Sequence, residues 1–153
     1  MTRKSAGILF FRFRNHVLEF LLVHPGGPFW KNKDLGAWSI PKGEFGDEEE
    51  PLAAARREVS EELGIQPKGN FIPLSPVKQN SGKYIYAWAL PYDIDPALIR
   101  SNTFDIEWPL KSGRKKQFPE VDKAAWFDAK EARNKINPGQ TGLIEELESK
   151  LLS

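Results

Sequence analysis

The chain has 153 residues, of which 40% are hydrophobic and 28% charged, and this profile predicts one soluble globular domain over residues 1–153. Its 22 basic and 21 acidic residues nearly cancel, so net charge gives no reason to expect binding to nucleic acid or to an anionic membrane. The sequence contains no cysteine, which excludes disulfides, zinc–thiolate sites and cysteine nucleophiles.

The N-terminal segment predicts a pair of strands. Residues 6–11 form an apolar run that Arg12 interrupts, too short for a signal-peptide core or a membrane span. We therefore expect a cytoplasmic protein with no membrane partner. Residues 7–13 and 17–23 are rich in aliphatic and aromatic side chains and predict two strands joined by a tight turn at residues 15–16.

The central part of the chain alternates loops with short predicted strands. Residues 25–36 contain several glycines and prolines and predict a loop. Residues 37–40 predict a short strand that ends at Pro41, and residues 71–78 and 83–90 predict two more strands.

A helix is predicted over residues 50–63. Pro51 suits a first helical turn, and the acidic run over residues 47–50 suits the positive end of the helix dipole. The alanines at 53–55 favour a helix, and Gly64 suits the position just after its end.

The C-terminal part predicts one strand and two helices. Residues 91–119 are punctuated by proline and predict a mostly irregular segment. Residues 124–127 predict a strand, and residues 128–136 and 142–152 predict helices. A short helical turn is also possible at residues 96–100. This order predicts an α/β (α+β) fold in which helices pack on a mixed sheet.

Glutamates cluster on one face of the predicted central helix. At about 100° per residue, Glu58, Glu61 and Glu62 fall within an arc of about 100°, beside an apolar stripe. Carboxylate oxygens are the ligands that Mg²⁺ and Mn²⁺ prefer, so this face can hold a divalent cation. A solvated, salt-bridged helix face has the same pattern, so the helix alone leaves both interpretations open.

The residues around this helix match a longer pattern. Five residues separate Gly43 from Glu49, and seven more separate Glu49 from the run Arg57-Glu58-Val59-Ser60-Glu61-Glu62-Leu63-Gly64-Ile65. At every fixed position this segment resembles the signature box of the Nudix hydrolase family. The resemblance implies a Nudix-type α/β/α sandwich with a mixed central sheet. It also implies a metal-dependent hydrolase that cleaves a pyrophosphate linkage in a nucleoside diphosphate linked to another moiety.

The same resemblance implies roles for individual residues. The implied metal ligands are the side chains of Glu58, Glu61 and Glu62 and the carbonyl of Gly43. The implied metal is Mg²⁺, for which Mn²⁺ can substitute. Arg57 would hold the acidic side chains in place and pair with Glu49. Metal ions held by carboxylates neutralise phosphate charge and activate water, so no covalent nucleophile is needed.

The general base has candidates inside and outside the box. Family members use either a box glutamate or an acid from a later loop. Here Glu58 is the first choice, Glu120 is the best later candidate, and Asp122 is the alternative to Glu120. Both loop acids are explained equally well as surface residues.

Lys42 and an aromatic strand are the predicted substrate contacts near the box. Lys42 directly precedes the box glycine, and the Pro-Lys-Gly lead-in resembles that of Nudix enzymes acting on dinucleoside polyphosphates or diphosphoinositols. Tyr84 and Tyr86 alternate with Trp88 on one strand face and could stack on a base. Such a stripe is more often core.

Two further features could contact the substrate. Trp30, with Phe29, lies in the loop before the box and is a candidate lid or stacking residue. The basic run Lys111, Arg114, Lys115 and Lys116 could meet a polyphosphate or an RNA 5′ end, although a solvated loop explains it as well. His16 and His24 show no ligand spacing and are predicted to be structural.

We therefore expect a small nucleotide or polyphosphate substrate, such as an NTP or a dinucleoside polyphosphate. The alternatives are an RNA 5′-pyrophosphohydrolase, a diphosphoinositol polyphosphate hydrolase and a non-catalytic nucleotide-binding Nudix module. Nucleic acid is otherwise not expected as a partner, and the sequence does not indicate an oligomeric state.

Overall fold

The first two strands form a tight hairpin in the computed structural model, which describes residues 3–152. Strands β1 (Lys4–Arg14) and β2 (Val17–Pro25) pair antiparallel. Asn15 and His16 between them have φ angles of 51° and 66°. Positive φ at both central residues is what a type I′ turn requires, so the predicted hairpin is confirmed.

Strand β1 lies at the centre of a mixed sheet. It pairs parallel with β6 (Tyr84–Pro91), and β2 pairs antiparallel with β9 (Val121–Asp128). Three short strands complete the sheet: β3 (Lys42–Glu44) on β1, and β4 (Ile72–Pro73) and β5 (Val77–Lys78) on β6. Because parallel and antiparallel pairs both occur, the sheet is mixed, as predicted.

The strand predicted at residues 37–40 is wrong in position. Trp38 and Ser39 form only isolated bridges, and the strand begins after Pro41, as β3. The carbonyl of Pro41 accepts a hydrogen bond from the Ile8 amide at 3.1 Å. Proline lacks a donor but keeps its acceptor, so it can lead into a strand that pairs with β1.

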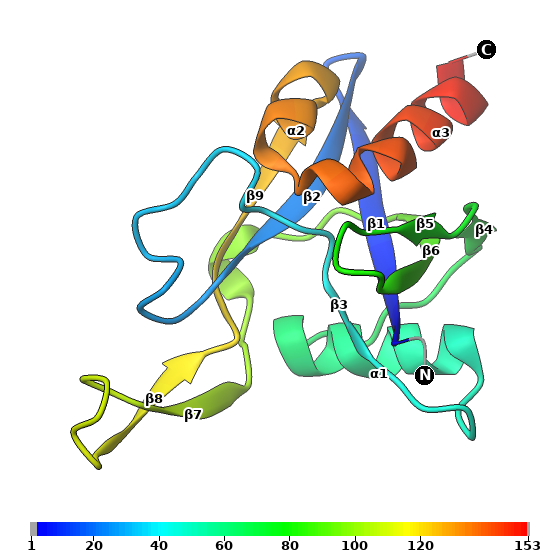
Figure 1. The fold of residues 1–153 in the computed structure, drawn as a ribbon. Helices are drawn as coiled ribbons and strands as arrows, with labels where there is room; N and C mark the ends of the chain where they lie inside the picture. Colours follow the sequence, from blue (N-terminus) through cyan, green and yellow to red (C-terminus); the bar gives the residue numbers. More distant parts are fainter. Residues whose placement is uncertain (1–2, 153) are drawn as a thin grey trace.

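The segment predicted to be irregular contains a second hairpin, which is a correction to the sequence-based expectation. Strands β7 (Thr103–Glu107) and β8 (Lys115–Pro119) form a separate two-stranded sheet. Figure 1 shows this hairpin, hereafter the β7–β8 arm, projecting away from the central sheet. The arm adds no strand to the main sheet, and the alternate residues of β7 that face inward, Phe104 and Ile106, are only half-buried. The short turn of helix at η1 (Pro96–Leu98) was predicted.

Helices cover both faces of the sheet. Helix α1 (Pro51–Leu63) lies on one face, and α2 (Ala129–Lys135), η2 (Pro138–Gln140) and α3 (Thr141–Leu152) lie on the other (Figure 1). The two hydrophobic clusters therefore lie on opposite sides of the sheet, which confirms the α/β/α arrangement. Between residues 3 and 152, no helix has the length and apolar character to cross a membrane.

Alternation along β1 explains how one strand supplies both layers. Leu9 packs in the cluster under α3, whereas Ile8 and Phe10 pack in the cluster under α1. All three side chains are fully buried. Each buried side chain of this size contributes about 1.5–3 kcal/mol, so β1 is a main source of stability.

Candidate active site

Helix α1 is fixed at both ends and along one side. The Glu50 carboxylate accepts the Ala53 amide at 2.8 Å, and the Gly64 amide donates to the Ser60 carbonyl at 2.8 Å. Gly64 has a φ of 72°, the left-handed conformation that ends helices. The buried residues of α1 are Ala54, Ala55, Val59 and Leu63. With this side anchored on the sheet, the glutamate-bearing side meets β3 and the loop before β9.

Strand β3 approaches α1 so closely that a side chain on its middle residue, Gly43, would displace Glu58. A Cβ placed on Gly43 would lie 1.8 Å from Glu58 Oε2. The neighbouring Lys42 amide donates to Glu62 Oε1 at 3.1 Å. The structure thus brings Gly43, Glu58 and Glu62, all predicted metal ligands, into one small region.

Arg57 contacts three acidic side chains, those of Glu49, Glu58 and Glu61. Its Nε and Nη2 donate to the two carboxylate oxygens of Glu49 at 2.8 and 2.9 Å. Its Nη1 donates to Glu58 at 2.9 Å and to Glu61 at 3.3 Å. These hydrogen bonds raise the pKa of Arg57, so the guanidinium stays charged.

Glu120 is linked to helix α1 by backbone hydrogen bonds between segments that are far apart in the sequence. The Asn102 amide donates to the Glu61 carbonyl at 2.9 Å, and the Glu120 amide donates to the Asn102 carbonyl at 2.8 Å. Glu120 and Glu62 line one cavity of about 110 Å³, together with Lys42. Asn102 therefore positions Glu120 relative to α1, a role that no sequence pattern indicated.

Asp122, the alternative loop acid, is held elsewhere. Its Oδ1 lies 2.9 Å from Nδ1 of His24, whose side chain is 1% exposed. The other ring nitrogen, Nε2, lies 2.7 Å from the Lys33 carbonyl. His24 is thus buried between the loop that carries Lys33 and strand β9, which agrees with the structural role predicted for it.

Burial raises the pKa of three carboxylates in this region, those of Glu58, Glu62 and Glu120. Burial raises the pKa of Glu62 to about 8, and the nearby Lys42 ammonium only partly opposes it. Burial also raises the pKa of Glu58 and of Glu120, and the charge of Glu61 raises both further. Lys42 is affected in the opposite sense, since burial lowers the pKa of its ammonium.

The carboxylates of this region are the ligand type that a hard divalent cation prefers, although they do not converge on one point as a complete set of ligands. Within residues 3–152, no three acidic or imidazole side chains converge as a metal cage. Arg57 holds Glu58 and Glu61 instead. Glu58 and Glu62 nevertheless both reach β3 from α1, at Gly43 and at Lys42, and their raised pKa values are a condition that a bound cation relieves.

The predicted aromatic contacts lie outside the cavity that holds Glu62 and Glu120. The Tyr86 ring packs edge-on against Phe45 with centroids 6.1 Å apart, and Lys78 lies 5.6 Å from the Tyr84 ring. Trp88 packs in the cluster under α1. All three side chains are half-buried on the α1 face of β6.

The loop before β3 contacts the β7–β8 arm. The Phe29 ring lies 5.8 Å from the Trp108 ring at 86°, and Trp30 is 39% exposed with the Lys33 ammonium 5.0 Å from its ring. Lys115 and Lys116 of the predicted basic run lie on β8. Sequence reasoning missed Trp108, although it continues the alternation of Phe104 and Ile106 along β7, which is the signal that could have found it.

Comparison with known proteins adds a family match. A model described as the NUDIX domain matches residues 1–147. No curated protein sequence matches the chain.

Several solved structures share the fold. A C. elegans Ap4A hydrolase in a binary complex is 20% identical, with a TM-score of 0.67 over 99% of this chain and 98% of that one. The NUDIX domain of Shewanella oneidensis NrtR, complexed with ADP ribose, is 17% identical, with a TM-score of 0.66 over 99% and 89%. The C-terminal domain of mouse MUTYH, in complex with human PCNA, is 16% identical, with a TM-score of 0.64 over 100% and 92%. At these identities the neighbours show the fold.

Proposed function

The chain belongs to the NUDIX domain family, and from this premise we propose that it uses Mg²⁺, or Mn²⁺ in its place, to hydrolyse a nucleoside diphosphate linked to another moiety. It is a pyrophosphohydrolase, with an NTP or a dinucleoside polyphosphate as its substrate. The observation that carries the proposal is the placement of Glu120 and Glu62 in one cavity beside Lys42. A salt-bridged surface helix would not gather a distant, partly buried carboxylate onto its acidic face.

Metal binding is assigned to the box residues. Glu58, Glu61, Glu62 and the carbonyl of Gly43 are the ligands. The cation, when bound, neutralises phosphate charge and makes a water molecule nucleophilic. Arg57 acts through the carboxylates, since its bidentate pair with Glu49 fixes the guanidinium that contacts Glu58 and Glu61.

Glu120 is the general base in this proposal, with Glu58 as the alternative. Arg57 and the close approach of Gly43 hold Glu58 in place, which suits a ligand. Glu120 comes from a different segment and lines the cavity. Burial raises the pKa of Glu120, and a base works best when its pKa lies near the working pH.

Lys42 is assigned to a substrate phosphate. Its side chain lines the same cavity as Glu62 and Glu120. Burial lowers the pKa of the Lys42 ammonium, and an anionic phosphate bound beside it would raise that pKa again.

The test is a substrate panel assayed with Mg²⁺ and with EDTA. The panel contains dinucleoside polyphosphates, NTPs, nucleotide sugars, diphosphoinositols and RNA carrying a 5′-triphosphate. We expect Glu61→Gln to abolish turnover, whereas the matched control Glu145→Gln, on the exposed side of α3, keeps it. Turnover confined to RNA or to diphosphoinositols would select one of those alternatives. A folded protein without turnover on any member would leave only the non-catalytic nucleotide-binding role.

A further inference from the structure

A second cavity lies between the loop of residues 26–36 and the β7–β8 arm. Its volume is about 550 Å³, which is within the range of small-molecule sites. Its lining residues are Gly27, Pro28, Lys31, Asn32, Trp108, Lys116, Phe118, Pro119 and Asp122. None of the box residues lines it, so it is separate from the cavity that holds Glu62.

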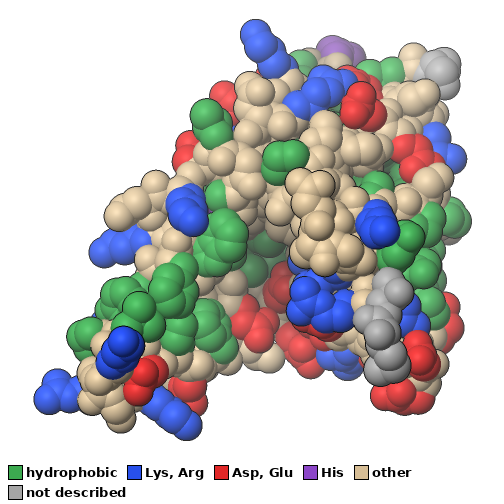
Figure 2. Space-filling view, in the orientation of Figure 1, with side chains coloured by type: hydrophobic (Ala, Val, Ile, Leu, Met, Phe, Trp, Pro, Cys, Tyr) green, Lys and Arg blue, Asp and Glu red, His purple; other side chains and the backbone are tan. Residues whose placement is uncertain are grey.

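The arm supplies an aromatic wall. Trp108 and Phe118 line the cavity from the arm, and both rings are braced from behind. Phe29 meets Trp108 edge-on at 5.8 Å, and Phe104 lies beside Phe118 with centroids 6.2 Å apart. Figure 2 shows apolar side chains gathered over the arm at the lower left of the molecule. These contacts hold the Trp108 and Phe118 rings, hereafter the aromatic platform, in place along the wall.

The rim of the cavity is cationic and polar. Lys31 and Lys116 line it from opposite walls, and Asn32 and Asp122 add an amide and a carboxylate. Lys111, Arg114 and Lys115 lie on the same arm, so positive charge is concentrated here in a chain whose net charge is only +1. An aromatic platform with a cationic rim suits a flat base that carries phosphates.

Buried His24 ties the loop wall to strand β9, which forms the floor beside Asp122. Its Nε2 bonds to the Lys33 carbonyl in the loop that carries Lys31 and Asn32. Its Nδ1 bonds to Asp122, which lines the cavity from β9. This buried polar side chain therefore fixes the loop wall of the cavity to the central sheet.

The cavity adjoins the candidate active site. Pro119 lines this cavity, and Glu120, the next residue, lines the cavity shared with Glu62. The Gly26 amide donates to the Glu120 carbonyl at 3.0 Å, so the loop wall is attached at the same point. A phosphate chain leaving the platform past Lys116 therefore has a short path to the carboxylates.

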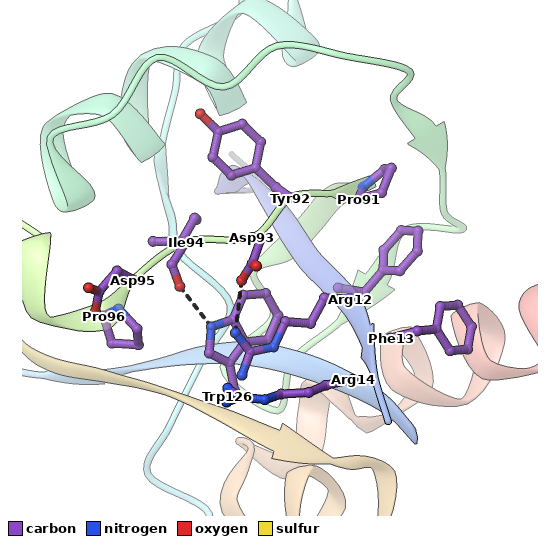
Figure 3. Close-up of a pocket in the computed structure, with 11 residues that line it drawn as sticks. Arg12, Phe13, Arg14, Pro91, Tyr92, Asp93, Ile94, Asp95, Pro96 and Trp126 are labelled. Atoms are coloured by element: carbon purple, nitrogen blue, oxygen red, sulfur yellow. Dashed lines mark hydrogen bonds and ion pairs between the residues drawn. The ribbon is translucent and has the colours of Figure 1, made fainter. Parts of the chain in front are cut away.

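We propose that this cavity is a subsite for the nucleobase on the far side of the scissile anhydride. The base stacks on Trp108 and Phe118, and the phosphates run between Lys31 and Lys116 toward Glu120. The proposal deepens the proposed function, on which it rests, by making dinucleoside polyphosphates the preferred substrate class. The cavity in Figure 3, lined by Arg12 and Trp126, is a weaker candidate because Asp93 and Glu19 already pair with Arg12.

The first experiment measures binding without turnover. Saturation-transfer NMR is recorded on the full chain in EDTA with each of the common nucleoside monophosphates. We expect transfer to the base protons of at least one of them in the wild type and in Glu61→Gln, and its loss in Trp108→Ala. Transfer that persists in Trp108→Ala, or none to any nucleotide, would overturn the subsite.

The second experiment compares two substrates that differ only in the far nucleoside, a dinucleoside tetraphosphate and the mononucleoside tetraphosphate with the same base. Stacking on an aromatic side chain is worth about 1–3 kcal/mol, so Trp108→Ala should lower kcat/KM for the dinucleoside by about 5- to 150-fold, through KM. The mononucleoside should be unaffected. Trp108→Phe keeps an aromatic ring and should retain most of the wild-type kcat/KM for the dinucleoside. The control Leu110→Ala, exposed at the tip of the same arm, should leave kcat/KM for both substrates unchanged.

Asn32→Ala, from the opposite wall, gives an independent check should Trp108→Ala fold poorly, and it should show the same selectivity. Equal losses on both substrates, or no loss on either, would refute the subsite. An inactive wild type that still binds a nucleotide through Trp108 would refute the hydrolase and leave the subsite standing.

Discussion

Replacing Glu62 by Gln should stabilise the metal-free protein at alkaline pH while removing its activity. Burial raises the pKa of Glu62 from 4.5 to about 8 in the folded chain. A raised carboxyl pKa contributes stability that is complete below the unfolded value and is lost as the pH rises through the folded value. Between about pH 6 and about pH 9, this one group should cost the wild type about 3 kcal/mol of unfolding free energy.

The glutamine variant lacks that titration but keeps the shape of the side chain. Its amide oxygen can still accept the Lys42 amide, as Glu62 Oε1 does at 3.1 Å. The stability of Glu62→Gln should therefore depend on pH less steeply than that of the wild type, and the curves should separate above neutral pH.

Urea unfolding in EDTA at about pH 6, 7.5 and 9 measures the difference, with Glu145→Gln as the surface control. Excess Mg²⁺ should flatten the wild-type curve, because a bound cation favours the ionised carboxylate, and should leave Glu62→Gln unchanged. Parallel pH curves for wild type and Glu62→Gln in EDTA would refute the assignment of Glu62 as a buried, destabilised ligand.

Three further substitutions probe the remainder of the site and the core. Gly43→Ala places a methyl group 1.8 Å from Glu58 Oε2, and a misplaced ligand of this kind should lower kcat by about 100-fold; near-normal kcat would argue against the close approach. Arg57→Lys cannot pair with Glu49 through two nitrogens, so Mg²⁺ affinity by calorimetry should fall about 10- to 100-fold, and unaltered affinity would remove Arg57 from the site. Leu147→Ala, in the core under α3, should cost about 2–5 kcal/mol in urea unfolding while the folded fraction keeps its specific activity.

The secondary-structure elements that depend on neighbouring residues were predicted correctly from the sequence. The turn at Asn15 and His16, the helix from Pro51 and its end at Gly64 were all predicted, because each depends on residues only a few positions apart. One error arose where a contact at longer range decided the outcome, and the other where a local alternating pattern was overlooked. Strand β3 forms after Pro41 only because β1 offers it a partner, and the β7–β8 arm forms outside the main core.

The glutamate cluster shows the same division. Glu58, Glu61 and Glu62 lie within two turns of one helix, so helical geometry alone places them together, and their spacing from Gly43 indicated the chemistry before any fold was known. The sequence by itself thus determined the family, the box helix and the candidate ligands. Only the tertiary structure decided which distant residues join them. Glu120 reaches the box through Asn102, and Trp108 reaches the loop at Phe29, by contacts between segments that are far apart along the chain. Spacing along a chain carries no information about such contacts, because the packed sheet and its connections create them.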